Sequence, residues 1–164
     1  MTKTKKAGPN RQCAAIPYVI KDGHVQVLLL TSRGTGRWIV PKGWPKKKHS
    51  AAETAALEAF EEGGVVGDVT PEPIGSYTYT KALNCGALQP LAVDVFALRV
   101  RYEALDWPER GQRKRVWVTP EEASLMVAEL ELADLLARFA SVERRARAAH
   151  EGAFVRSPVA NMPI

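Results

Sequence analysis

Residues 50–65 read SAAETAALEAFEEGGV, a segment that predicts a helix with a clear beginning and end. Ser50 followed three residues later by Glu53 forms a capping box, a pattern that satisfies free N–H groups at a helix start. The alanine-rich run that follows has high helix propensity, and Gly63-Gly64 supplies a stop. The sequence therefore predicts a helix over about Ala51 to Glu62.

Three glutamates share one side of this helix. Glu58, Glu61 and Glu62 stand at i, i+3 and i+4, so their side chains project together. Their mutual repulsion, and their place near a helix C-terminus, make the arrangement unfavourable without a cation. A hard divalent ion such as Mg²⁺ or Mn²⁺ would resolve the conflict, and a merely solvated acidic face is the alternative interpretation. The opposite side is expected to be buried and carries Ala52, Ala56, Ala59 and Phe60.

Apolar segments rich in β-forming residues flank the helix on both sides. The first two are separated by Asp22-Gly23, a strong hairpin signal. The expected strands span residues 13–20, 25–32, 37–40, 74–80, 91–100 and 116–118. Pro120 opens a further helix, and a longer amphipathic helix is expected over about Glu129 to Ala148. This order predicts an α/β (α+β) fold, in which a mixed sheet lies between helices.

The bulk composition indicates one globular domain. With 164 residues, 46% of them hydrophobic and 25% charged, the chain can bury a real core. No apolar stretch approaches the roughly 20 residues of a membrane span. Cys13 and Cys85 suggest neither a zinc site nor a disulfide framework, which fits a cytoplasmic location. We expect a flexible segment over residues 1–10, one domain over 11–150 and a tail over 151–164.

Gly43 and the run EAFEEGGV at residues 58–65 stand at a spacing that resembles the Nudix box, a 23-residue motif of metal-dependent hydrolases. Residues 37–41 and the basic segment 112–117 are similar to those of diphosphoinositol polyphosphate and diadenosine polyphosphate hydrolases, and the similarity covers roughly residues 11–136. The resemblance implies a Nudix-like α/β/α sandwich with a mixed β-sheet and a loop-helix-loop catalytic motif. Two positions depart from the box, since His49 replaces its early glutamate and Leu57 its arginine.

The resemblance also implies roles for individual residues. Glu58 and Glu62, with the Gly43 carbonyl, would bind Mg²⁺ or Mn²⁺, and Glu61 would bind metal or act as the catalytic base. Forked guanidinium groups suit phosphate oxygens, and an ammonium group adds positive potential. The substrate-binding positions implied in this way are Arg11, Ser32, Arg33, Lys42 and Arg113. The lysines at residues 46–48 flank the box glycine and could add positive potential above the metals, although each one individually is interpreted as a surface residue.

The implied activity is metal-dependent hydrolysis of a phosphoanhydride bond by water attack at phosphorus. The substrate would be a small anionic polyphosphate: a diphosphoinositol polyphosphate, a diadenosine polyphosphate or a related nucleoside diphosphate derivative. The net charge of +5 agrees with an anionic partner. One alternative is a catalytically weak Nudix-fold sensor that binds a phosphorylated ligand, and another is an RNA 5′-end pyrophosphohydrolase. Basic clusters without an aromatic stacking platform give no case for sequence-specific nucleic-acid binding, and nothing indicates an oligomeric state.

Overall fold

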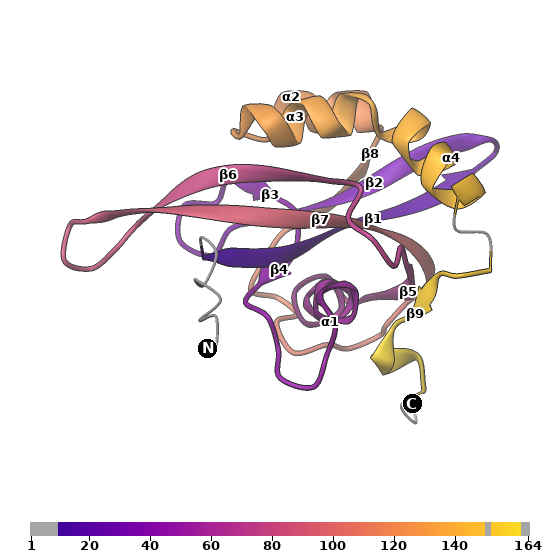
Figure 1. Ribbon diagram of the computed structural model, residues 1–164, viewed down its shortest axis with the longest axis horizontal. Coiled ribbons are helices and arrows are strands. Elements are labelled where there is room, and N and C mark those ends of the chain that lie inside the picture. Colours follow the sequence, from indigo (N-terminus) through magenta and orange to yellow (C-terminus); the bar gives the residue numbers. More distant parts are fainter. Residues whose placement is uncertain (1–9, 150–151, 162–164) are drawn as a thin grey trace, which may run out of the picture.

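The computed structural model describes residues 10–149 and 152–161, which form a sheet with helices on both of its faces (Figure 1). Residues 1–9, which make up nearly all of the segment expected to be flexible, lie outside the described residues. Residues 150–151 and 162–164, at the start and end of the expected tail, lie outside them too. Within the described part, no helix is long and apolar enough to cross a bilayer.

A mixed β-sheet of nine strands forms the middle layer. Its main path runs β3-β2-β1-β7-β5-β9, while β4 pairs with β1, β6 with β7 and β8 with β2. The pair β1–β7 at the centre is parallel, and the other pairs are antiparallel. The strands are β1 (Arg11–Lys21), β2 (His24–Thr31), β3 (Trp38–Ile39), β4 (Lys42–Gly43), β5 (Val65–Val69), β6 (Gly75–Ala82), β7 (Leu88–Glu103), β8 (Arg115–Val118) and β9 (Val155–Arg156).

Helices cover both faces of this sheet (Figure 1). The helices are α1 (Ala51–Gly63), α2 (Pro120–Met126), α3 (Leu130–Ala137) and α4 (Phe139–Ala149). Because side chains alternate along a strand, β1 contributes to two cores. Cys13 and Ala15 pack in the core beneath α1, whereas Ala14, Ile16 and Tyr18 pack in the core beneath α2, α3 and α4. The expected α/β/α sandwich with a mixed sheet is confirmed.

Helix α1 begins and ends where its local sequence predicts. The Ser50 hydroxyl accepts a hydrogen bond from the Glu53 N–H, and the Glu53 carboxylate accepts one from the Ser50 N–H. Gly64 adopts a left-handed conformation with φ of 69°, and its N–H donates to the carbonyls of Ala59 and Phe60. Glycine adopts this conformation without the steric cost of a Cβ. The observed end at Gly63 lies one residue beyond the predicted end.

The long C-terminal helix expected over residues 129–148 is instead two helices, and the prediction is wrong on this point. The chain leaves helical geometry at Arg138, where φ is −99° and ψ is 5°. This break lets α3 bury Leu132, Leu135 and Leu136 while Phe139 packs edge-on against Tyr18, with ring centroids 5.3 Å apart. Packing of two apolar faces against the sheet thus outweighs the helix propensity of the intervening residues.

Short elements elsewhere were not expected. Strand β5 contains Gly67 and Asp68, which both have low strand propensity, yet it pairs with β7 through a register shift at Val66/Gly67. Beyond Gly152 the chain adds β9 to the sheet edge and then forms a 3₁₀ helix, η1 (Pro158–Asn161). Part of the tail that carried no structural prediction is therefore ordered against the domain.

Candidate active site

Three of the glutamates of α1, Glu58, Glu61 and Glu62, lie against the loop that precedes the helix. Glu58 and Glu62 are buried, with 8% and 5% of their surfaces exposed, whereas the side chain of Glu61 is 37% exposed. Burial of a carboxylate is costly unless a cation or hydrogen-bond donors compensate it. On the other side of α1, Ala52, Ala56 and Ala59 are buried as predicted, and Phe60 is only partly buried.

Gly43 brings the backbone of β4 directly against Glu58. A Cβ atom at residue 43 would lie 2.9 Å from Glu58 Oε2, and closer still to Oε1 and to the carboxyl carbon. The neighbouring Lys42 N–H donates to Glu62 Oε1 over 3.4 Å. The Gly43 backbone therefore approaches the carboxylates in a way that a larger residue would obstruct, which explains physically why a glycine stands there.

Glu62 lies in an unusual electrostatic environment. Burial raises its pKa far above the usual range, the nearby Glu58 raises it further, and Arg113 and Lys42 only partly oppose the shift. Arg113 Nη2 lies 3.3 Å from Glu62 Oε2, yet that buried oxygen makes no hydrogen bond. A buried acceptor without a partner is uncommon and marks a position where an additional cation or donor would be stabilising.

The residues present suit a hard divalent ion in their chemistry. Three carboxylates and the Gly43 carbonyl offer oxygen donors of the kind that Mg²⁺ and Mn²⁺ prefer. The Oε2 atom of Glu62, which makes no hydrogen bond, agrees with this donor set. Across residues 10–149 and 152–161, however, no three His, Cys, Asp or Glu side chains are already grouped as metal ligands. Glu58 and Glu61 are instead turned toward Lys46, whose Nζ lies 3.0 and 3.4 Å from them.

Lys46 was interpreted from the sequence as a surface lysine, and the structure places it inside the site. Burial alone would lower the pKa of Lys46, but its contacts with Glu58 and Glu61 raise it above the usual value. The side chain is therefore positively charged at neutral pH. The run of three lysines gave no signal that separated Lys46 from its neighbours.

A basic cavity of about 370 Å³ lies beside the glutamates. Its lining is Thr31, Ser32, Arg33, Gly36, Gly111, Gln112, Arg113 and Lys114. Three of the predicted substrate-binding residues, Ser32, Arg33 and Arg113, are thus brought together by the end of β2 and the loop before β8. The Arg33 side chain is 61% exposed, and its Nη1 lies 3.3 Å from both Glu109 and Gln112.

Arg113 connects this cavity with α1. Only 8% of its side chain is exposed, and its guanidinium contacts Glu62 and Glu109 and donates to the Thr31 carbonyl over 3.1 Å. Glu109 was not singled out in the sequence. Its N–H donates to the carbonyl of Glu61 over 3.0 Å, which ties its loop to the C-terminal end of α1. Carbonyl groups in the last turn of a helix need hydrogen-bond donors from outside the helix, but the sequence does not show which loop supplies those donors.

The other two predicted substrate-binding residues do not line this cavity. Arg11 makes two hydrogen bonds to Asp94 on β7, at 3.0 and 2.6 Å. Lys42 places its Nζ 5.2 Å from the centre of the Tyr79 ring, and burial lowers its pKa. At the two positions that depart from the box, His49 contacts Glu53 over 3.4 Å and Leu57 is partly buried.

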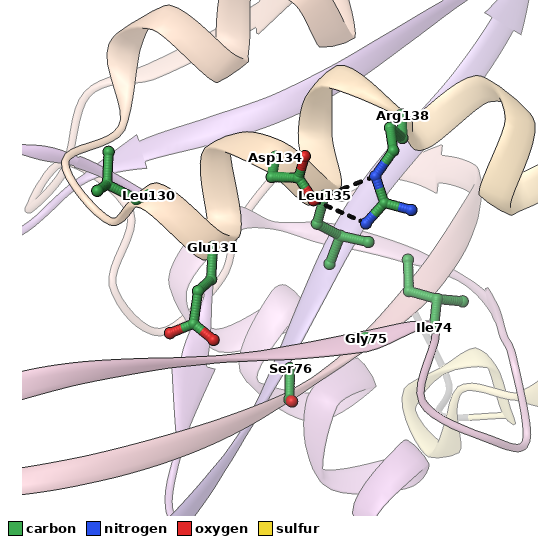
Figure 2. Close-up of a pocket in the computed structure, with 8 residues that line it drawn as sticks. All are labelled: Ile74, Gly75, Ser76, Leu130, Glu131, Asp134, Leu135 and Arg138. Atoms are coloured by element: carbon green, nitrogen blue, oxygen red, sulfur yellow. Dashed lines mark hydrogen bonds and ion pairs between the residues drawn. The ribbon is translucent and has the colours of Figure 1, made fainter.

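A second cavity, of about 450 Å³, lies on the other face of the sheet between β6 and α3. Figure 2 shows its lining, in which Leu135 and Ile74 form an apolar wall and Asp134 pairs with Arg138 at the rim. None of the α1 glutamates contributes to it. Although this cavity is larger, it does not bring together groups suited to hydrolysis, so the candidate site is the one beside α1.

A NUDIX domain family model matches residues 10–139. Nudix hydrolase 12, mitochondrial, of Arabidopsis thaliana is 31% identical over 121 residues, covering 72% of this chain and 58% of that relative. Nudix hydrolase 16, mitochondrial, of the same plant is 33% identical over 112 residues, covering 63% and 62% respectively. The chain thus matches less than two thirds of the length of these relatives.

Solved structures show the same fold. The crystal structure of a C. elegans Ap4A hydrolase matches with a TM-score of 0.57 at 18% identity, covering 81% of this chain and 97% of that one. The NUDIX domain of Shewanella oneidensis NrtR, complexed with ADP ribose, matches with a TM-score of 0.55 at 13% identity, covering 81% and 87%. The family model covers most of the chain, and the box residues lie together on α1 and β4. This protein therefore belongs to the Nudix domain family.

Proposed function

We propose that this chain is a metal-dependent hydrolase that cleaves a phosphoanhydride bond in a small polyphosphorylated molecule by water attack at phosphorus. The observation that carries the proposal is the buried Oε2 of Glu62, which makes no hydrogen bond although Arg113 lies 3.3 Å away, and which stands next to Glu58 and the backbone of Gly43. Arg113 contacts the same glutamate and lines a basic cavity. Acidic groups for a divalent cation thus stand beside basic groups for phosphate, as phosphoanhydride cleavage requires.

The buried and exposed glutamates suit different roles. Glu58, Glu62 and the Gly43 carbonyl would hold Mg²⁺ or Mn²⁺, which when bound neutralises charge on the phosphoryl oxygens. Glu61 is the most exposed of the three glutamates, so its carboxylate can meet a water molecule and accept its proton. Arg113 holds Glu62 in place from the cavity side through their 3.3 Å contact.

The basic cavity favours a substrate with several phosphate groups. Arg33 and Lys114 are exposed at its lining, and Ser32 offers a hydroxyl group there. Forked guanidinium hydrogen bonds and a nearby ammonium group suit phosphate oxygens rather than a neutral ligand. Lys42 and Arg11, which lie outside the cavity lining, would bind more distant parts of the substrate. Diphosphoinositol polyphosphates, diadenosine polyphosphates and related nucleoside diphosphate derivatives, such as ADP ribose, all fit this description.

The decisive test is hydrolysis by the purified protein in the presence of Mg²⁺ or Mn²⁺. The substrates are a diphosphoinositol polyphosphate, diadenosine tetraphosphate, ADP ribose and triphosphorylated RNA, with products identified by mass spectrometry. Reaction in ¹⁸O-water should place the label in a phosphate product. Glu62→Gln should abolish turnover while the protein stays folded. Glu72→Gln, a charge-matched change at an exposed residue that makes no ion pair in the described structure, should leave turnover intact.

Two outcomes would contradict the proposal. Full activity of Glu62→Gln would show that the proposed metal site on α1 is not required for the reaction. Thermal stabilisation by a phosphorylated ligand without any product would indicate a ligand sensor in place of an enzyme. Turnover of triphosphorylated RNA in preference to the small molecules would instead change the substrate class and keep the chemistry.

The cytoplasmic location expected from the sequence stays a prediction. Cys13 is buried and Cys85 is exposed, and both are free thiols in the described structure. The two Arabidopsis relatives described above are named as mitochondrial proteins. Fractionation of cells that produce the tagged protein would decide between these compartments.

A further inference from the structure

Lys46 forms an ion-pair bridge between two of the three glutamates. Its Nζ lies 3.0 Å from Glu58 Oε1 and 3.4 Å from Glu61 Oε2. Within the described structure these are the ion pairs that Glu58 and Glu61 make, and Glu62 is paired with a different cation, Arg113. The positive charge of Lys46 therefore offsets the repulsion between Glu58 and Glu61.

Hydrogen bonds hold the backbone of Lys46 in place, so its contact with the glutamates is not that of an unconstrained surface side chain. Its N–H donates to the Thr54 hydroxyl over 3.2 Å, and its carbonyl accepts from the His49 N–H over 3.3 Å. Thr54 is fully buried on α1. The next residue, Lys47, is exposed and makes no ion pair with the described residues. The loop thus presents one particular lysine to the carboxylates.

The sequence explains why this contact is needed. The box position directly before Glu58, where an arginine is usual, is Leu57, and its side chain cannot neutralise a carboxylate. Lys46 supplies a cation from the loop between β4 and α1 instead. A lysine can do so reversibly, because its ammonium group sits on a flexible four-carbon stem.

We propose that Lys46 is a positioning residue that holds Glu58 and Glu61 when no metal is bound and competes with the divalent cation for their oxygen atoms. This inference rests on the proposed function, since it takes Glu58 and Glu61 to be metal-facing. Both the ammonium group and a divalent ion are attracted to Glu58 Oε1 and Glu61 Oε2. Metal loading therefore requires the ammonium group to withdraw, and this exchange weakens metal affinity.

The test compares Lys46→Met with Lys47→Met, which remove the same charge from adjacent residues. Calorimetric titration with Mn²⁺ at neutral pH should show that Lys46→Met binds the ion roughly fivefold more tightly than wild type, a change of about 1 kcal/mol. Lys47→Met should stay within about twofold of wild type, because an exposed charge is screened by salt. Lys46→Gln, which keeps a polar side chain, should behave like Lys46→Met.

Thermal unfolding gives an independent measurement. In EDTA, Lys46→Met should unfold at a lower temperature than Lys47→Met, since Glu58 and Glu61 then face each other without a cation. Added Mn²⁺ should raise its unfolding temperature by more than it raises that of wild type, as tighter ligand binding to the folded state requires. A lysine that only supported the loop would lower stability without tightening metal binding.

The outcomes separate this inference from the function on which it rests. If wild type binds Mn²⁺ and Glu62→Gln does not, while Lys46→Met binds no more tightly than Lys47→Met, the competition by Lys46 is overturned and the metal site stands. If wild type shows no Mn²⁺ binding that depends on Glu62, both the metal site and the role of Lys46 are overturned.

Discussion

Replacing Gly43 by alanine gives a sharp test of the site, because the added methyl group would collide with a carboxylate instead of with the core. Ordinary van der Waals contact of a Cβ atom begins at 3.4 Å, whereas Glu58 Oε2 lies at 2.9 Å and the other carboxyl atoms lie closer. The carboxylate must therefore move by about 1 Å, and a displacement of that size in a catalytic group can cost about 100-fold in rate. We expect metal-dependent turnover of diadenosine tetraphosphate to fall by about that factor.

The stability of Gly43→Ala should change little. The movement breaks at most the partly exposed ion pair between Glu58 and Lys46, which is worth up to about 1 kcal/mol. The unfolding temperature should then fall by no more than about 4 °C in a domain of this size. Gly34→Ala is the matched control, because a Cβ there meets nothing within 4 Å. Wild-type turnover by Gly43→Ala, or a loss shared by Gly34→Ala, would show that the close approach of residue 43 to Glu58 does not control turnover.

Three further predictions concern pH dependence, the core and the cap of α1. The pKa of Glu62 is raised from 4.5 to about 8, so the folded protein binds more protons than the unfolded chain between these pH values. In EDTA, wild type should therefore lose stability as pH rises through about 8, and Glu62→Gln should show a flatter dependence of stability on pH. Parallel pH profiles of the two proteins would contradict this. Phe139→Ala should lower the free energy of unfolding by about 3–5 kcal/mol in urea titrations, since the ring is fully buried against Tyr18. Ser50→Ala should cost about 1 kcal/mol in the same assay, because it removes the hydroxyl that accepts the Glu53 N–H, and an unchanged midpoint would show the cap to be dispensable.

Elements with local signals could be predicted from the sequence, and those fixed by distant partners could not. Both ends of α1 follow from Ser50, Glu53 and Gly64, whose effects act within a few residues. Strand β5 contains Gly67 and Asp68 and is a strand because β7 lies beside it. The break at Arg138 likewise depends on where Phe139 meets Tyr18, which is a contact across 121 positions of the chain, from 18 to 139.

The contacts of the candidate site likewise include some that local sequence predicts and some that depend on distant parts of the chain. The helix period was sufficient to expect that Glu58 and Glu62 lie on one side of α1. That Gly43 meets them was expected only from the resemblance to the Nudix box, because a loop separates Gly43 from the helix. The contact of Lys46 with two glutamates depends on the course of a loop and on a side-chain conformation, which a sequence does not show. Arg113 was expected to contact phosphate, and the structure adds its contact with Glu62.

The parallel pairing of β1 with β7 sets an order for assembly during synthesis. Arg11 lies opposite Ala92, so the two central strands join residues 81 positions apart, from 11 to 92. A nascent chain that has emerged only through α1 therefore carries the first hairpin with one edge open, and an open edge invites pairing with other chains. Contacts between such distant residues also slow folding, because a long loop must close before they form. The β7 segment is accordingly the part of the polypeptide whose emergence from the ribosome should mark the onset of protease resistance.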